Sequence, residues 1–299
     1  MTDVINAAKK KKVSGVSHVG LISTVDKGVG AKMFYALFAI LLVIISLLCI
    51  LPPVWVLLSG FKEGKEFFSI PPTIIPKHFN VKKLADTWHI FKFGGYYRNT
   101  IVLAIGSIVF KVTLAGMAGY VIALVRPKGV GIFEKILMIT MMIPGNMMLA
   151  TLYKNIVSLG LLNSYIPLWM MSAADTFMVL VFRSFFSGIP TALVEAASID
   201  GSGEVQTLFK IILPMSKPVV VTAVILTING TWSDFFWPYL IIKDKGLYTI
   251  MLQIFSLKTA ESVDVVMISL IFAIIPPVLL FVIFQKFIMQ GFTMSGIKG

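Results

Sequence analysis

Long apolar runs separated by short polar stretches dominate the pattern of this chain. An α-helix rises 1.5 Å per residue, so about 20 apolar residues cross the roughly 30 Å hydrocarbon core of a bilayer. Six runs have about that length, and each predicts one membrane-spanning helix: 33–58, 100–124, 136–152, 166–186, 219–242 and 265–288. The pattern therefore predicts an all-α integral membrane protein with six transmembrane helices.

The interval 190–214, between two of these runs, carries helix signals of its own. Its apolar residues recur at helical spacing: Ala192, Leu193, Ala196 and Ile199, and then Val205, Leu208, Phe209 and Ile212. Asp200-Gly201 ends the first helix, because glycine accepts the left-handed conformation that other residues avoid. Ser202 is the expected cap of a second helix, and Pro214 its expected end. We expect two short amphipathic helices joined at a glycine.

The composition agrees with a membrane protein and limits its chemistry. Of 299 residues, 57% are hydrophobic and 13% are charged, whereas soluble domains carry roughly a quarter charged residues. Cys49 is the single cysteine, so neither a disulfide framework nor a cysteine metal site is expected. The sequence contains no G-x-x-x-x-G-K-[ST] loop and no H-E-x-x-H motif. We expect no catalytic residue, metal or cofactor in this chain, and no enzyme; ATP, if used, is bound by another chain.

Basic residues give a formal net charge of +12 and gather at the ends of the apolar runs. This placement is typical of membrane topology, so we expect membrane lipid and no nucleic acid as a partner. The run of lysines at 9–12 also fits a lipid or nucleic-acid patch, but the favoured interpretation is a solvated tail that marks the cytoplasmic side. Because cytoplasmic loops are enriched in Lys and Arg, the tail before residue 33 and the loop with Arg126 and Lys128 are placed in the cytoplasm, as is the C-terminus after six spans. The outer loop 60–98 holds seven basic residues and fits the rule less well.

Charges inside apolar runs point to positions that face protein or a pore, since exposing them to lipid costs several kcal/mol. Lys111 lies about 18 Å into its span and Asp175 about 14 Å into another, counted at 1.5 Å per residue. Both depths are near the bilayer midplane. We expect these side chains to face the interior, either paired with each other or each with a polar partner of its own. In the same span as Lys111, Ala115, Ala118 and Gly119 are small enough for close helix packing.

The fifth run contains the string T-I-N-G-T-W-S-D-F-F-W-P. Asn229, Ser233 and Asp234 are the residues expected to line a pathway, because such groups bind hydroxylated ligands by hydrogen bonds. Gly230 and Pro238 are expected places for a break in the helix. The alternative is an aromatic belt at the membrane interface, formed by Trp232, Trp237 and Pro238.

The segment 190–214 also carries a family resemblance. The string E-A-A-S-I-D-G, followed by a hydrophobic stretch ending in Leu-Pro, resembles the EAA loop of binding-protein-dependent ABC importer permeases. Asn99-Thr100 and the string W-S-D-F are similar to further family motifs, with Ser233 in place of the usual Asn. The C-terminal string G-F-T-M-S-G-I-K-G resembles the end of the six-span subunit of carbohydrate importers of the maltose type.

The resemblance implies a permease core, a set of partners and contact residues. The implied organisation is a cytoplasmic tail (1–32), a first span with an extracytoplasmic loop (33–98), a five-span core with the EAA loop (99–289) and a cytoplasmic tail (290–299). The implied partners are a second homologous permease subunit, two ATP-binding cassette subunits that bind ATP and Mg, and an extracytoplasmic sugar-binding protein. The implied contacts with the ATPase are Glu195, Ala196, Ala197, Asp200, Gly201 and Pro214 in the loop, and Lys298 and Gly299 in the tail.

By this resemblance the chain is a transmembrane permease subunit of an ATP-driven sugar importer in the plasma (inner) membrane. Three alternatives stay open. A secondary transporter or channel would also contain intramembrane charges. A membrane scaffold would need none of the polar residues at mid-depth. An ABC importer could carry a different solute, such as a glycerol phosphate or a modified peptide.

Overall fold

The computed structural model describes residues 29–71 and 73–295, with several side chains at the two ends left out. All regular structure in this part of the chain is helical, and the chain divides into two compact units, Met1–Val54 and Trp55–Gly299. The expected cytoplasmic tail before residue 29 and the contact residues Lys298 and Gly299 lie outside the described residues. Helix α2 (Val29–Ser59) confirms the first apolar run as one long helix, with Pro52 and Pro53 inside it.

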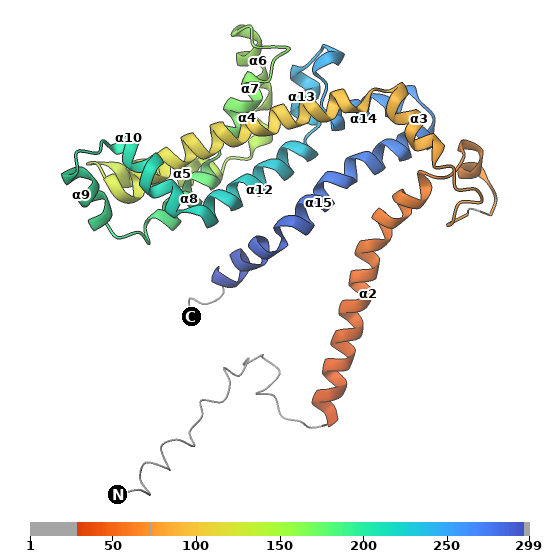
Figure 1. Ribbon diagram of the computed structural model, residues 1–299, viewed down its shortest axis with the longest axis horizontal. Coiled ribbons are helices and arrows are strands. Elements are labelled where there is room, and N and C mark those ends of the chain that lie inside the picture. The colour runs from red at the N-terminus through yellow and green to blue at the C-terminus, as the bar shows by residue number, and fades with distance from the viewer. Residues whose placement is uncertain (1–28, 72, 296–299) are drawn as a thin grey trace, which may run out of the picture. The chain divides into compact units, whose positions relative to one another are not determined.

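Helix α4 (Phe93–Tyr120) is the element around which the second unit is built. Its most extensive contacts are with α7, α8 and α12, and α12 in turn contacts α15 (Figure 1). The bounds of these partners are α7 (Ile166–Ala173), α8 (Thr176–Phe186), α12 (Lys217–Ser233) and α15 (Val263–Ser295). At its C-terminal end α4 continues as a π-helical turn, η2 (Val121–Val125). The second and sixth apolar runs are thus confirmed as long helices.

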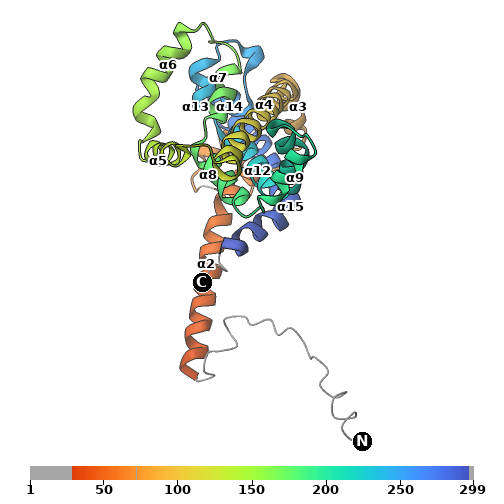
Figure 2. The same ribbon diagram turned by 90° about the vertical axis from the view of Figure 1, so that its left-hand side faces the viewer.

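The expectation of continuous helices for the third and fourth runs was wrong, and the fifth run is broken as expected but at a different residue. The third run is divided between α5 (Val130–Met141) and α6 (Leu149–Ser158), with a turn and the short helix η3 (Gly145–Met148) between them. Helices α5 and α6 run in different directions (Figure 2). Pro144 lacks the backbone N–H that a continuing helix needs, and Gly145 follows it.

The other two runs break at an aspartate. In the fourth run, α7 and α8 meet at a bend of 45°, and the side chain of Asp175 caps α8 by accepting from the N–H of Met178. In the fifth run, α12 ends before Asp234 and α13 (Phe236–Ile241) follows. The break is therefore at neither Gly230 nor Pro238, because the Asp234 carboxylate accepts the N–H groups of the new helix and so fixes its start.

By length and composition, three described helices can cross a membrane: Met33–Ser59, Phe93–Val125 and Val263–Lys286. Counting each of two bent helix pairs as one span raises the number to five. The six-span count stays a prediction.

The segment 190–214 forms two helical pieces with a left-handed glycine between them, as expected. The pieces are α9 (Ala192–Ile199) and a continuous series of α10 (Glu204–Thr207), the π-helical turn η4 (Leu208–Ile212) and α11 (Leu213–Met215). Gly201 has φ +78°. Two details were wrong. Gly203, not Ser202, is the cap residue. Pro214 is not the last residue, since the series continues to Met215 before the chain turns at Ser216.

The apolar pattern of α9 does not face the protein. Ile199 is 86% exposed and Ala196 is exposed, whereas Ala197 is 4% exposed. In the second piece Leu208 and Ile212 are buried, while Val205 and Phe209 are exposed. Ala197 is buried and Val194 packs against the core, so tertiary packing and not hydropathy alone decides which side of α9 faces the protein.

The remaining helices cover the other end of α4. They are η1 (Gly64–Phe68), α3 (Lys82–Ile90), η5 (Lys245–Leu247) and α14 (Ile250–Ala260). Helix α3 lies in the loop 60–98, between its prolines and α4. Helix α14 is an apolar helix that the pattern of spans did not predict, and it buries Ile250, Leu252, Ile254 and Leu257.

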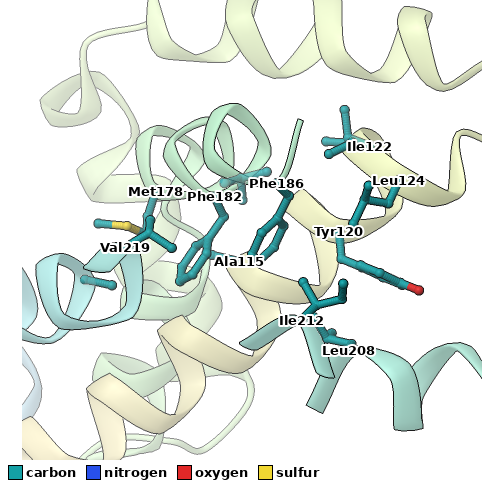
Figure 3. Packing of buried hydrophobic residues seen from close by; sticks show 13 residues of the cluster. Ala115, Tyr120, Ile122, Leu124, Met178, Phe182, Phe186, Leu208, Ile212 and Val219 are labelled. Atoms are coloured by element: carbon teal, nitrogen blue, oxygen red, sulfur yellow. The ribbon is translucent and has the colours of Figure 1, made fainter. Parts of the chain in front are cut away.

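One of three buried clusters joins the segment 190–214 to the membrane helices. It contains residues of α4, η2, α8, the 208–212 turn and α12 (Figure 3). Helices α4 and α8 approach closely at Gly119, where a Cβ atom would lie 2.7 Å from Cβ of Phe182 and 2.9 Å from the backbone N of Arg183. The small residue expected to serve close packing does so here.

Candidate functional site

A partly open cavity of about 220 Å³ lies between α4, α7, α12 and α13. Its wall carries both polar and apolar side chains. Its lining consists of Leu103, Ser107 and Lys111 from α4, Leu168, Met171 and Ser172 from α7, Leu226, Thr227, Gly230 and Thr231 from α12, and Asp234 and Trp237 beyond it. The cavity thus joins residues from three separate apolar runs of the sequence.

Lys111 and Asp175 form an ion pair at this cavity. The Nζ atom of Lys111 lies 2.7 Å from Oδ2 of Asp175, and the two side chains are 13% and 28% exposed. The other carboxylate oxygen, Oδ1, accepts the backbone N–H of Met178 at 3.1 Å. Of the two alternatives left open by the sequence, the structure shows the one in which these two charges pair with each other. Asp175 therefore has two tasks: it neutralises the lysine and it begins α8.

Asp234 lies where α12 ends, and its carboxylate is held by the backbone. Its Oδ1 atom accepts from the N–H groups of Phe236 at 2.9 Å and Trp237 at 3.3 Å. This arrangement turns the chain so that the indole of Trp237 joins the cavity wall. The structure brings Asp234 and Lys111 to one cavity, as the prediction for a pathway requires.

Two other residues predicted for the pathway do not line this cavity. Asn229 and Ser233 are exposed elsewhere on α12. The orientation of this helix is set by Trp232, which is 5% exposed and donates from Nε1 to the carbonyl of Ala273 in α15 at 3.0 Å. Because Trp232 faces α15, Asn229 and Ser233 lie on the exposed side of α12, while Thr231 lines the cavity. Trp232 is a packing residue, so the structure does not support the alternative interpretation for this tryptophan, an aromatic belt.

The sequence reasoning missed the hydroxyl groups of the cavity. Ser107 lies one helical turn before Lys111, and Thr227 and Thr231 lie four residues apart on α12. Ser172 completes this group from α7. The signal that could have found them was the helical spacing of polar residues from Lys111 and Asp234, since residues four apart share one face of a helix.

Asn99 and Thr100, about two turns into α4, attach this helix to the chain around the start of α14. The Nδ2 atom of Asn99 donates to the carbonyls of Gly246 at 2.7 Å and Tyr248 at 3.0 Å. The hydroxyl of Thr100 accepts the N–H of Ile250 at 2.9 Å. Both side chains are buried. The motif thus has a structural task, which is to close the end of the bundle opposite the segment 190–214.

Five of the six residues predicted for a contact in the segment 190–214 lie on its surface. Glu195, Ala196, Asp200, Gly201 and Pro214 are exposed, and Ala197 is buried beneath them. Ile199, Val205 and Phe209 add exposed apolar area to the same segment. A shallow depression beside Phe209 is lined by Gly203, Glu204, Val205, Gln206 and Lys210. The surface offers both carboxylates and apolar side chains to a partner.

Comparisons with known proteins bear on both regions. Residues 19–293 match the family model described as binding-protein-dependent transport system inner membrane component. The chain is 28% identical to the arabinooligosaccharides transport system permease protein AraQ of Bacillus subtilis (strain 168), over 85% of this chain and 92% of that one. It is 30% identical to the probable ABC transporter permease protein YurM of the same organism, over 83% of both chains.

Two further comparisons concern a different solute and the fold. The chain is 28% identical to the sn-glycerol-3-phosphate transport system permease protein UgpE of Yersinia pestis bv. Antiqua (strain Antiqua), over 85% of this chain and 95% of that one. A chain in the crystal structure of a bacterial ABC transporter involved in the import of the acidic polysaccharide alginate has a TM-score of 0.76 and 22% identity. The match covers 88% of this chain and 99% of that chain, and it shows that the two share a fold.

Proposed function

Because the chain belongs to the family of binding-protein-dependent transport system inner membrane components, we propose that it is a permease subunit of an ATP-driven sugar importer and forms half of the transmembrane pathway. The observation that carries the proposal is the cavity between α4, α7 and α12, with hydroxyls, one indole and an internally neutralised lysine on its wall. Hydroxyl and carboxylate groups exchange hydrogen bonds with sugar hydroxyls. An indole offers an apolar face to a sugar ring.

The state of the lysine favours a neutral solute over a phosphate ester. Proteins bind phosphate through Arg and Lys side chains. The lysine on the described cavity wall is paired with Asp175 at 2.7 Å, and Asp234 adds a second carboxylate. This half of the pathway therefore carries more negative than positive charge. The chemistry agrees with a neutral oligosaccharide, as in the name of AraQ, better than with the glycerol phosphate in the name of UgpE.

The partners and topology follow the same proposal. A second, homologous permease chain covers the open side of the cavity, two ATP-binding cassette subunits hold ATP and Mg, and an extracytoplasmic sugar-binding protein delivers the solute. The chain lies in the plasma (inner) membrane with six spans, counting each broken run as one. Both termini and the segment 190–214 are cytoplasmic, where Lys298 and Gly299 also contact the ATPase subunits.

The segment 190–214 is the EAA loop of this permease, and its exposed face docks on one ATPase subunit. Linkage dictates the mechanism: ATP can drive a bundle between two access states only if the ATPases bind those states with different affinity. Closure of the ATPases moves the docked loop, and the helices attached to the loop move as rigid bodies. The surface of α9 supports this role, because Glu195, Ala196 and Asp200 are exposed and accessible to a partner protein.

Purification of the affinity-tagged chain from membranes tests the assembly. We expect an ATP-binding cassette protein and a second permease to copurify, and the reconstituted complex to import a labelled neutral oligosaccharide only with ATP and the binding protein. Uptake that continues after ATP depletion and stops with an ionophore would indicate a secondary transporter instead. Import of glycerol phosphate in preference to oligosaccharide would contradict the assignment of the solute.

Loss of the Lys111–Asp175 pair is expected to lower uptake. Lys111→Ala and Asp175→Ala should each reduce the uptake rate by about tenfold or more, since an unpaired charge near the bilayer midplane costs several kcal/mol. Asp175→Asn is the matched control, because its amide oxygen still accepts the N–H of Met178 but carries no charge. If Asp175→Asn transports normally, the carboxylate acts only as a helix cap.

The double exchange Lys111→Asp with Asp175→Lys tests whether the ion pair itself is required, because it restores the pair with the charges reversed. We expect partial recovery of uptake over either single exchange, because the pair is restored. Recovery should be incomplete, since a lysine cannot accept the N–H of Met178 and losing a helix cap costs about 1 kcal/mol. No recovery at all would contradict a role for the pair.

A further inference from the structure

The hydroxyl of Tyr120 joins the last residue of α4 to the segment 190–214. It donates to Oε2 of Glu204 over 2.6 Å, a length typical of a charge-assisted hydrogen bond, which is stronger than a bond between neutral groups. Tyr120 is 2% exposed, and its ring packs with Leu208 and Ile212 in the buried cluster (Figure 3). Glu204, by contrast, is exposed. The bond therefore links a fixed side chain of the bundle to the surface segment.

Besides the apolar contacts of the buried cluster, two attachments join the segment to the helices that line the cavity, and this hydrogen bond is the second of them. The first is covalent: the chain turns by 87° at Ser216, between the 204–215 helical series and α12. Ser216 is fully buried, and its hydroxyl donates to the carbonyl of Ile212 at 2.7 Å. A segment held at one point can rotate about that point. A segment held at two points on two helices carries both helices with it.

Both attached helices form the cavity. Helix α12 contributes Thr227 and Thr231, and α4 contributes Ser107 and Lys111. From Lys111 to Tyr120 the chain is one uninterrupted helix, a length of about 14 Å at 1.5 Å per residue. A displacement of Tyr120 is thus passed along α4 to the lysine at the cavity.

The backbone near each of the two hydrogen-bonded residues contains a π-helical turn, which is uncommon in proteins. The π-helical turn η2 begins at the residue after Tyr120, and the π-helical turn η4 begins at Leu208. Side chains of both turns, Ile122 and Leu124 from one and Leu208 and Ile212 from the other, belong to the same buried cluster. Single π-helical turns are rare and occur frequently at functional sites. Two of them meet where the segment joins the bundle.

We propose that the Tyr120–Glu204 hydrogen bond is a positioning contact that makes α4 follow the segment 190–214 when the ATPase subunits move it. The proposal rests on the coupling role proposed above for this segment. Neither side chain touches the transported solute. Without the bond the segment still docks and still moves α12, but the α4 wall of the cavity follows incompletely, so ATP is hydrolysed without import.

The test uses the complete reconstituted importer and measures ATP molecules hydrolysed per solute imported. Tyr120→Phe removes one oxygen and keeps the buried ring. Glu204→Ala removes the acceptor at an exposed position that the core does not depend on. We expect each variant to raise the number of ATP molecules hydrolysed per solute imported by about tenfold. This factor corresponds to the lower end of the free energy lost with a hydrogen bond to a charged group. Glu204→Gln keeps an oxygen that accepts from Tyr120 and should stay close to the unmodified ratio.

The double variant Tyr120→Phe with Glu204→Ala separates the pair from a direct contact of Glu204 with the ATPase. If the residues act together, the double variant is no worse than either single one. A further increase on adding Glu204→Ala to Tyr120→Phe would overturn the proposal, as would an unchanged ratio in Tyr120→Phe. Absence of ATP-driven uptake in the unmodified complex would instead refute the proposed function itself.

Discussion

A Gly201→Val variant should insert in the membrane and assemble with its partners, yet lose at least about nine-tenths of ATP-driven uptake. Gly201 has φ +78°, and a Cβ atom built on it meets no atom within 4 Å. Space is therefore available, and the cost comes from the backbone alone. A residue with a side chain pays roughly 1–2 kcal/mol in the left-handed region, and more when it is β-branched. The turn at Gly201 that joins α9 to α10, called the joint below, must then open.

The joint sets how α9 is presented to a partner. The N–H of Ser202 donates to the carbonyl of Ala197 at 2.9 Å, and the N–H of Gly201 donates to that of Ser198 at 3.1 Å. A residue that avoids positive φ breaks these bonds, so Glu195 and Ala196 leave their places relative to the second helical piece. The buried cluster below does not include Gly201. The membrane helices should therefore fold normally.

Gly201→Asn is the matched control, because asparagine is tolerated in the left-handed conformation. We expect it to retain most uptake and most of the ATPase stimulation. Glu195→Lys provides an independent test on the exposed face of α9: it leaves the joint intact, reverses one charge, and should lower both activities. The measurement is ATPase stimulation and uptake by the reconstituted complex, with membrane content determined by immunoblot. Normal uptake in both Gly201→Val and Glu195→Lys would refute the coupling role of the segment.

Gly119→Val is expected to prevent folding of the bundle, the largest structural effect of any single change considered. At Gly119 a Cβ atom would lie 2.7 Å from Cβ of Phe182 and 2.9 Å from the backbone N of Arg183. These atoms belong to the backbone and the base of a fully buried side chain, so they cannot swing aside. Overpacking of a core costs about 1–3 kcal/mol and occasionally more. Separation of α4 from α8 would also uncover Phe182 and Phe186.

Gly116→Ala tests the same helix three residues earlier and serves as the control. The nearest atom to its added Cβ is Cδ2 of Leu213 at 3.7 Å, an ordinary contact, and alanine favours a helix over glycine by up to about 1 kcal/mol. We expect Gly116→Ala to unfold at an unchanged or higher temperature in detergent, and Gly119→Val to be recovered in low yield or to unfold many degrees lower. Equal unfolding temperatures for the two variants would show that α4 and α8 do not approach closely here.

The candidate site was predictable where it depended on depth and chemistry. Counting residues into each run placed Lys111 and Asp175 at similar depth, and two opposite charges in hydrocarbon gain by pairing. Counting did not show that Asn229 and Ser233 lie outside the cavity of this chain, because the direction in which α12 faces is decided by Trp232 and its hydrogen bond to Ala273; their place in the pathway stays a prediction. The contact between Tyr120 and Glu204, 84 residues apart, left no local pattern at all.

The sequence by itself determined that the chain is helical and lies in a membrane, where the long helices α2, α4 and α15 are, and that a glycine divides the segment 190–214. These features are local, since hydropathy over about 20 residues and the left-handed preference of glycine act without distant partners. Only the tertiary structure decided where the other runs break, which residues face the cavity, and which side of α9 is outward. Those features depend on side-chain caps and on packing between helices far apart in the chain, as at Asp175, Asp234 and Gly119.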